Sequence, residues 1–319
     1  MTINLDKKDI KILKVLDENF RVPFSKIAKK VGLSKNSVGL RFQKLKNIML
    51  HNTAGVNNKF LGYTLVKIFY IIDSFDKNVE DEIIHELKKL KKVVYAARHY
   101  GHYNLEVAMF VTNFDELSNQ INRFNKKISK KINNKEIEII VKEFFFGNRF
   151  LYEKPAIKPR TIIFSNDRKE ISKSDKIILS TLRVNPRISL LELAEKSSLN
   201  TKTVINHIKK LEKEGIITGY FMMLDYSKFN LSTFKLLIQV SNIIDEESFE
   251  KYLFSIKNVK HFSKMLGPWD YEIDVLYPSM LELQQQIELI KQAFPHQIKR
   301  IEIISHGKRI LTNQERFLY

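Results

Sequence analysis

The fold of this chain is decided by the stretch Gly32-Leu33-Ser34-Lys35-Asn36-Ser37-Val38-Gly39-Leu40-Arg41-Phe42-Gln43-Lys44-Leu45-Lys46. Gly32 allows a turn, and Ser34 is a favourable N-cap because its hydroxyl accepts a hydrogen bond from a free backbone N–H. Val38, Phe42 and Leu45 recur at helical spacing and form a buried side. The residues left on the outer faces are Lys35, Asn36, Ser37, Arg41 and Lys44. A short helix, a tight turn and a basic second helix are typical of a helix-turn-helix (HTH) recognition element.

A second copy of this pattern begins 166 residues later, in Leu199-Asn200-Thr201-Lys202-Thr203-Val204-Ile205-Asn206-His207-Ile208-Lys209-Lys210-Leu211. Two helices precede this pattern in each copy. In the first copy the longer helix is predicted at 6–18, and the shorter one runs from Phe24 to Val31. The repeat therefore has the length of a whole multi-domain unit and not that of a solenoid repeat.

After each HTH pattern the hydrophobic period changes to that of strands. In the first copy a link at 51–63 precedes these strands. A short strand is also predicted at 161–164, inside a linker between the two copies. In the first copy we expect strands at 65–73, 93–99, 105–111 and 136–146, with helices at 79–90 and 114–128. In the second we expect strands at 233–240, 259–266, 271–277 and 298–305, with helices at 246–256 and 280–294. The order βαββαβ is ferredoxin-like, and the fold class is α+β.

These elements divide the chain into five parts. The predicted boundaries are 1–50 for the first HTH domain, 62–150 for the first ferredoxin-like domain, 151–171 for a linker, 172–220 for the second HTH domain and 231–319 for the second ferredoxin-like domain. A βαββαβ module has one open sheet face that needs a partner. Because the linker is short, we expect the two modules to pair within one chain as a pseudo-dimer, which then self-associates further.

The composition limits the classes of function. A net charge of +18 favours a polyanionic partner, most simply nucleic acid, although a lysine-rich surface also keeps a protein soluble. The chain has no cysteine, which excludes disulfides, thiolate catalysis and cysteine metal sites. Apolar runs such as 68–72 are too short to span a bilayer, and the N-terminus has no secretory core, so we expect a cytoplasmic protein.

Several ordered motifs resemble the Lrp/AsnC family of transcriptional regulators, also called feast/famine regulators. They are Leu5-Asp6, Asn19-Phe20-Arg21 with Asn185-Pro186-Arg187, Leu193-Ala194, Val31 to Ser34, Val38 to Arg41, Gly215 to Tyr220, and Gly267-Pro268-Trp269-Asp270-Tyr271. The resemblance covers nearly the whole chain as two tandem family units. It implies two winged or HTH DNA-binding domains that alternate with two ligand-sensing (RAM-type) ferredoxin-like domains.

The resemblance implies double-stranded DNA as the partner and no cofactor. The predicted DNA contacts of the first copy are Ser34, Lys35, Asn36, Ser37, Arg41 and Lys44, and those of the second are Thr201, Lys202, Thr203, Asn206, His207 and Lys210. Lysines suit phosphate contacts, whereas Asn36 and Arg41 can pair bidentately with base edges. His207 replaces Arg41 in the second copy, so the two readers are predicted to differ.

The same resemblance implies a small-molecule effector, such as an amino acid. Its predicted contacts are Gly101, Asn104, Gly267, Trp269 and Asp270. The alternative for both glycines is a hairpin turn that needs positive φ. His99 and His102 are read as residues of a surface hairpin and not as metal ligands, and we predict no metal site.

No catalytic constellation stands out, and we predict that the protein is not an enzyme. The alternative is a sirohaem decarboxylase-like enzyme, because such proteins resemble the same family and occur as paired units. Arg98, His99, His102 and Arg149 are the residues that could clamp a tetrapyrrole. A third alternative is a weakly specific DNA packager.

Overall fold

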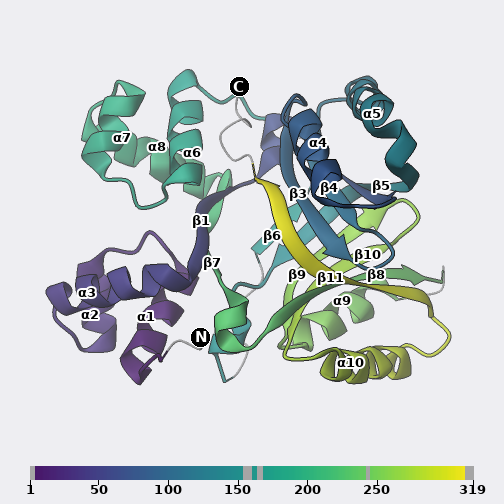
Figure 1. The fold of residues 1–319 in the computed structure, drawn as a ribbon. Helices are drawn as coiled ribbons and strands as arrows, with labels where there is room; N and C mark the ends of the chain where they lie inside the picture. Colours follow the sequence, from purple (N-terminus) through teal and green to yellow (C-terminus); the bar gives the residue numbers. More distant parts are fainter. Residues whose placement is uncertain (1–3, 154–159, 164–167, 242–244, 313–319) are drawn as a thin grey trace.

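The computed structural model describes residues 4–153, 160–163, 168–241 and 245–312. Pro155 and Pro159 of the predicted linker lie outside these residues. So does Arg316-Phe317-Leu318-Tyr319, which repeats the sequence of Arg149-Phe150-Leu151-Tyr152. Within the described ranges, no helix has both the length and the apolar character that a membrane crossing requires. Figure 1 shows two HTH lobes on one side of the molecule and a body of sheets and helices on the other.

Each HTH lobe consists of three helices. The first contains α1 (Lys7–Glu18), α2 (Phe24–Val31) and α3 (Lys35–Leu45), and the second contains α6 (Lys173–Val184), α7 (Leu190–Ser197) and α8 (Thr201–Lys213). The capping residues expected from the sequence are present: Asp6 and Asp9 form a capping box on α1, as Ser172 and Asp175 do on α6. Gly32 ends α2 with φ +66°, a left-handed conformation that glycine adopts without strain.

A two-stranded ribbon follows the HTH lobes. It joins β1 (Met49–Val56) of the first half to β7 (Ile217–Leu224) of the second in antiparallel register, with Ala54 opposite Tyr220. The prediction that 51–63 is a link is therefore wrong for its first part, because a single isolated strand gave no sign of its distant partner. The ribbon takes one strand from each unit, so the two halves of the chain share it.

Within the described part of the chain, eight further strands close into a ring. In the first half they are β2 (Thr64–Ile72), β3 (Val93–Tyr100), β4 (Leu105–Val111) and β5 (Ile132–Phe145). In the second half they are β8 (Ser232–Val240), β9 (Val259–Leu266), β10 (Tyr271–Tyr277) and β11 (Ile298–Thr312). Their order is β2-β4-β3-β11-β8-β10-β9-β5, and β5 returns to pair with β2. A short strand, β6 (Arg160–Ile163), pairs with β5 in antiparallel register, as the sequence suggested for 161–163, and residue 164 lies outside the described residues.

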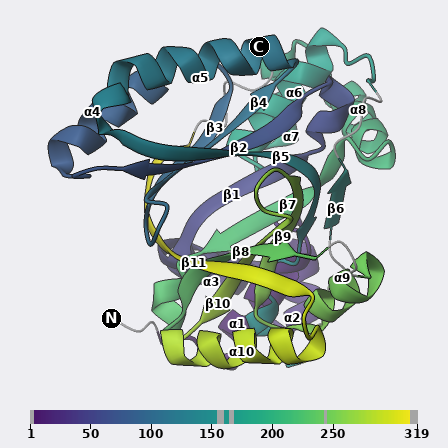
Figure 2. The ribbon, with the colours of Figure 1, turned by 90° about the vertical axis from the view of Figure 1, so that its right-hand side faces the viewer.

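The ring is a flattened barrel between two layers of helices. Figure 2 shows α4 (Lys77–Leu87) and α5 (Phe114–Ile128) outside the first sheet, with α9 (Glu246–Ser255) and α10 (Met280–Ala293) on the opposite outer side. One apolar cluster lies under each helix pair, and a third runs through both HTH lobes and the ribbon into the barrel. The two open sheet faces thus cover each other, which confirms the prediction that the modules pair within one chain.

Candidate DNA-binding surface and the interior of the barrel

Helices α3 and α8 present polar N-terminal ends to solvent. Ser34 Oγ accepts the Ser37 N–H at 3.0 Å, and Asn200 Oδ1 accepts the Thr203 N–H at 2.8 Å, so both helices begin where the sequence placed them. The exposed residues among the predicted DNA contacts are Ser34, Lys35, Asn36, Lys44, Thr201, Lys202, Asn206 and Lys210. Ser37 and Thr203 are half-buried. Val38 and Val204, both fully buried, fix the orientation of the two helices.

Arg41 is not free on the outer face of α3, as the helical pattern had suggested. Its Nη1 lies 2.6 Å from Asp6 Oδ2 and 2.7 Å from Asp9 Oδ1, and Lys44 Nζ lies 3.1 Å from Asp9 Oδ2. The hydrogen bond with Asp6 and then that with Asp9 raise the pKa of Arg41. Asp6 and Asp9 lie at the start of α1, so these contacts join α3 to that helix, and the Asp9 carboxylate is buried. Contact of Arg41 and Lys44 with DNA stays a prediction.

His207 occupies the equivalent place in the second lobe. Its Nδ1 lies 2.7 Å from Asp175 Oδ1, the counterpart of the Arg41 to Asp9 contact. Burial works against ionisation of Asp175, but the hydrogen bonds from His207 and Ser172 outweigh it and lower the pKa of that carboxyl. The substitution of histidine for arginine therefore preserves a helix-to-helix contact in both lobes.

The two HTH lobes are held together by a reciprocal contact. Arg21 Nη1 donates to the carbonyls of Pro186 and Ile188, at 2.5 and 3.2 Å. Arg187 Nη1 donates to the carbonyls of Phe20 and of Val22, the latter at 3.0 Å. Each arginine thus binds the loop that carries the other, so the Asn-x-Arg motif of the two copies forms the contact between the lobes.

The predicted effector contacts lie at two matching ends of the barrel. Asn104 Oδ1 accepts the Ile72 N–H at 2.7 Å, and Asp270 Oδ2 accepts the Val240 N–H at 2.8 Å. Both side chains therefore bind the end of the neighbouring first strand. Gly101 has the expected positive φ, +146°.

Gly267 does not have a positive φ, so that part of its turn interpretation is wrong. A Cβ there would lie 2.6 Å from the Ile137 carbonyl oxygen and 2.2 Å from Glu138 Oε2, so the reason for glycine is the close approach of β5. Trp269 is 2% exposed, and its Nε1 donates to Glu136 Oε2 at 2.7 Å. These residues are packed against protein groups, and their role as effector contacts stays a prediction.

Charged side chains fill the interior of the barrel. Lys67 Nζ lies 2.6 Å from Glu272 Oε1, and Lys235 Nζ contacts the same oxygen and lies 3.3 Å from Glu106 Oε2. All four are nearly inaccessible to solvent. Burial disfavours the charge on Lys235, yet Asp274, Glu106 and Glu272 together raise its pKa well above the usual value. These ion pairs join strands of both halves, so they link the two modules.

Histidines complete this network. His99 Nε2 lies 2.9 Å from Glu106 Oε2, and the His99 ring meets that of His306 edge to face at 4.9 Å. His99 is 1% exposed, so the prediction of a surface-hairpin histidine is wrong for His99, while His102 is exposed. The error arose because the hairpin's partner strand β11 comes from the other half of the chain.

His261, Glu272 and Asp274 form a trio that the sequence analysis missed. One ligand atom from each lies within 4.8 Å of the others, a spacing that a cation could bridge. Lys235 already contacts both carboxylates, at 3.4 Å in the case of Asp274 Oδ1, and so supplies positive charge there. One signal in the sequence could have indicated this charged interior. Glu106 and Glu272 are charged residues that occupy the same strand position in the two copies, each within an apolar run.

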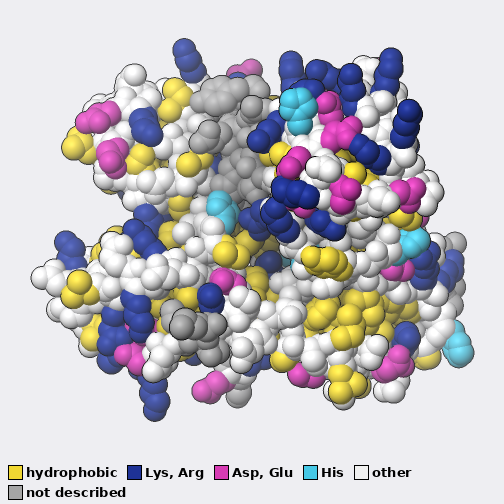
Figure 3. Space-filling view, viewed as in Figure 1, with side chains coloured by type: hydrophobic (Ala, Val, Ile, Leu, Met, Phe, Trp, Pro, Cys, Tyr) yellow, Lys and Arg dark blue, Asp and Glu magenta, His cyan; other side chains and the backbone are white. Residues whose placement is uncertain are grey.

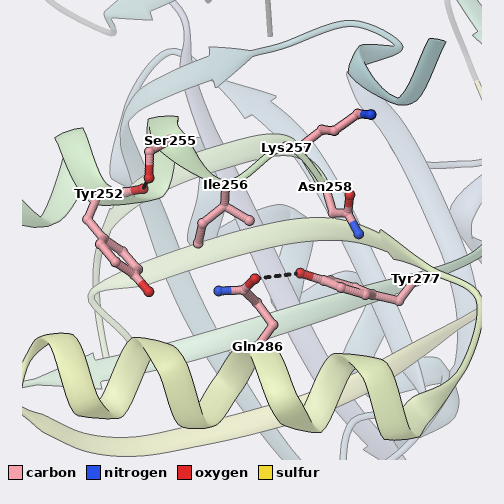
Figure 4. A pocket seen from close by; sticks show the side chains of 7 residues that line it. All are labelled: Tyr252, Ser255, Ile256, Lys257, Asn258, Tyr277 and Gln286. Atoms are coloured by element: carbon pink, nitrogen blue, oxygen red, sulfur yellow. Dashed lines mark hydrogen bonds between the residues drawn. The ribbon is translucent and has the colours of Figure 1, made fainter. Parts of the chain in front are cut away.

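A shallow hollow of about 350 Å³ lies between α9 and α10, and it was also not predicted (Figure 4). Tyr277 Oη donates to Gln286 Oε1 at 3.1 Å across it. Its lining residues are Tyr252, Ser255, Ile256, Lys257, Asn258, Tyr277 and Gln286.

Two family descriptions match the HTH lobes. The AsnC-type helix-turn-helix domain matches residues 5–46, and a winged helix-turn-helix DNA-binding domain matches residues 171–218. A crystal structure of the siroheme decarboxylase NirDL superposes with a TM-score of 0.65 over 98% of this chain and 96% of that one. At 14% identity this likeness shows the fold alone.

Curated relatives match parts of the chain. An uncharacterized HTH-type transcriptional regulator of Pyrococcus furiosus is 29% identical over 139 residues, which are 42% of this chain and 88% of the relative. The HTH-type transcriptional regulator Ptr1 of Methanocaldococcus jannaschii is 32% identical over 102 residues, which are 31% of this chain and 68% of Ptr1. Together with the two HTH lobes and the duplicated βαββαβ order, these matches show that the chain belongs to the Lrp/AsnC family, with two family units in one polypeptide.

Proposed function

We propose that this protein binds double-stranded DNA through α3 and α8 and regulates transcription. The observation that carries the proposal is the pair of HTH lobes. In each lobe the third helix, α3 or α8, has an exposed polar N-terminal half and buries its apolar side in the lobe. In Figure 3, Lys and Arg side chains are visible on both lobes. The regulators of Pyrococcus furiosus and Methanocaldococcus jannaschii named above support the same function.

The reciprocal Arg21 and Arg187 contacts support simultaneous use of both lobes. Because each guanidinium binds the other lobe's loop, the two helices are held in a fixed relation before DNA is met. Preorganisation of this kind lowers the entropy lost on binding. The different residues at positions 41 and 207 favour an asymmetric, imperfect palindrome as the preferred site.

The experiment is a salt titration of affinity by fluorescence anisotropy, with duplexes enriched by the protein from genomic DNA. With roughly six to ten phosphate contacts, affinity falls on the order of a thousandfold or more between low and moderate salt. Lys35→Ala and Lys202→Ala each reduce the salt slope by about one. Lys11→Ala and Lys176→Ala, at exposed positions of α1 and α6, are the matched controls. A salt-independent affinity contradicts the proposal.

A small-molecule effector, such as an amino acid, completes the proposal, with contacts at Gly101, Asn104, Gly267, Trp269 and Asp270. Binding of an effector there requires the side-chain contacts around Trp269 to rearrange, because Trp269 is packed on Tyr103 and Glu136. Titration of each of the twenty amino acids into the DNA complex is the test. An affinity for DNA that none of them changes contradicts this part of the proposal.

A sirohaem decarboxylase-like enzyme is the second candidate, because NirDL shares the fold over nearly the whole chain. The residues suggested for a tetrapyrrole clamp do not meet in one site. His99 is buried against Glu106, whereas Arg149 donates to the carbonyls of Phe254 and Ile256, at 2.9 and 3.2 Å. Visible absorption of the protein titrated with sirohaem separates the candidates: a saturable shift in the spectrum favours the enzyme, and an unchanged spectrum favours the regulator.

A further inference from the structure

The contact between the HTH lobes is symmetric in its hydrogen bonds but not in its packing. The guanidinium of Arg187 stacks on three aromatic rings of the first lobe. The distances from its Cζ to the ring centroids of Phe24, Phe42 and Phe20 are 4.6, 5.2 and 5.7 Å. Such stacking is favourable because the ring faces carry negative charge density. Arg187 therefore has a complete aromatic platform in the first lobe.

Arg21 meets a different surface on the second lobe. The residues 166 positions after Phe24 and Phe42 are Leu190 and Ile208, and Lys209 takes the place of Gln43. In the described part of the chain, the aromatic ring that Arg21 contacts is that of Tyr220, whose centroid lies 5.9 Å from Arg21 Cζ. The aliphatic replacements are smaller than two phenyl rings, so the platform that supports Arg187 has no equivalent on α7 and α8.

A cavity of about 360 Å³ lies where this platform is missing. Five of its lining side chains are apolar and three are cationic. They are Pro23, Ile188, Leu190, Ile205, Ile208, Arg21, Arg187 and Lys209. The volume is at the lower end of the range for small-molecule sites. The apolar walls come mostly from α7 and α8, and the cations from both lobes.

The cations of this cavity form no ion pair. Among the described residues, no carboxylate oxygen lies within 4.0 Å of Arg21, Arg187 or Lys209. Glu212, the acidic residue that acts on Arg21 from farther away, accepts a hydrogen bond from Tyr220 Oη and does not line the cavity. Both guanidinium groups line the same cavity, and burial, and then the like charge of Arg21, lower the pKa of Arg187. An anion would relieve this repulsion with charge-assisted hydrogen bonds.

We propose that this cavity binds a small organic anion with one aromatic ring, that is, an aryl-substituted carboxylate such as an arylacetate. The ring occupies the place that Phe24 and Phe42 fill in the first lobe and stacks on Arg21, and the carboxylate meets Lys209 and the guanidinium groups. An amino acid is excluded as the preferred ligand, because its ammonium group would face three cations and no carboxylate. The site is separate from the predicted effector contacts at the barrel and does not depend on DNA binding.

The test is isothermal titration calorimetry of the full chain, without DNA, using phenylacetate as the probe. Acetate lacks the ring, 2-phenylethanol lacks the charge, and 2-phenylethylamine reverses it. The proposal predicts saturable one-to-one binding of phenylacetate, with each of the other three compounds at least tenfold weaker. Equal binding of acetate, or no binding of phenylacetate, overturns it.

Two variants locate the site. Leu190→Phe restores the residue found at this place in the first lobe and fills the cavity, so phenylacetate affinity falls at least tenfold while the melting temperature is maintained or rises. Leu191→Phe is its control, because Leu191 is 64% exposed and does not line the cavity. Lys209→Glu weakens binding about fivefold, and Lys213→Glu, one turn further on α8, does not. Binding that Leu190→Phe and Lys209→Glu both leave unchanged contradicts the assignment.

Discussion

Arg21 and Arg187 lie 166 positions apart and bind each other's loops, with Arg21 Nη1 2.5 Å from the Pro186 carbonyl oxygen and Arg187 Nη1 3.0 Å from that of Val22. In a protein of two unlinked subunits this would be an intersubunit contact. Here a single chain contains both partners, and the two HTH lobes are fixed without a second molecule.

The first prediction concerns this contact. The double variant Arg21→Gln, Arg187→Gln removes charged donors to four carbonyls, each worth about 1.5–3 kcal/mol. Hydrogen exchange at residues 19–22 and 185–188 then becomes faster, while exchange in the barrel strands is unchanged. Arg123→Gln, at an exposed position of α5, is the control. Unchanged exchange at both loops would show that the lobes do not depend on these arginines.

The second prediction concerns Arg41. Arg41→Ala leaves the buried carboxylate of Asp9 with Lys44 as its remaining cationic side-chain partner, so the first HTH lobe loses local stability. Hydrogen exchange in α1 and α3 measures this loss. If Arg41 also reads a base, preference at one half-site is relaxed by about 1–3 kcal/mol as well. His207→Ala has a smaller effect on DNA at neutral pH.

The control for Arg41→Ala is Lys35→Ala, at an exposed position where no stability loss is expected. Relaxed DNA preference with unchanged exchange in α1 and α3 would mean that Arg41 acts on DNA and contributes little to the lobe.

The third prediction concerns Glu138. This carboxyl is fully buried beside Gly267, and burial raises its pKa to about 8. The folded chain therefore holds the proton that an unfolded chain releases near pH 4.5, so the free energy of unfolding decreases as the pH rises from about 4.5 to about 8. Glu138→Gln removes this decrease, so the free energy of unfolding of the variant gains about 4 kcal/mol relative to that of the unmodified chain between pH 5 and pH 8.5.

Urea denaturation of both proteins at the two pH values measures this difference. Glu302→Gln, at a partly exposed carboxyl of β11, is the control. An identical pH dependence with and without Glu138 would contradict the assignment of a protonated buried carboxyl.

The fourth prediction concerns the isolated first half. In the intact barrel, β3 pairs with β11 and β5 pairs with β9, so residues 1–160 alone expose two strand edges and one open sheet face. Unpaired strand edges associate readily. Sedimentation velocity should show this fragment as a homodimer that reproduces the closed ring. A folded monomer at high concentration would contradict the interpretation of the halves as mutual partners.

Local sequence patterns predicted most elements. Residues 105–111 and 114–128 are found at the expected bounds because each has an uninterrupted period of its own. The β1–β7 ribbon and the closure of the ring could not be predicted, since they depend on pairing between residues more than 110 positions apart. For the same reason Lys67 and Glu272 were not recognised as an ion pair.

For the candidate DNA surface, the positions of the residues were predicted more accurately than their side-chain contacts. The N-caps and the exposed ends of α3 and α8 followed from the helical period, but the carboxylate partners of Arg41 and His207 come from another helix of each lobe. The cavity beside Arg21 exists because residues of the second copy are smaller than the first-copy residues at the same positions. The sequence shows this size difference, but its importance is apparent only once the contact between the two lobes is known.

The central claim is that one chain places both recognition helices on one DNA duplex. Hydroxyl-radical footprinting of the full chain, on a duplex enriched from genomic DNA, tests it most directly. The account predicts protection of two adjacent half-sites centred about 34 Å apart along one face of the duplex. In the Lys35→Ala, Asn36→Ala variant one half-site loses protection, and in the Thr201→Ala, Lys202→Ala variant the other does. A footprint of one half-site, or equal weakening of both by either variant, would contradict the account.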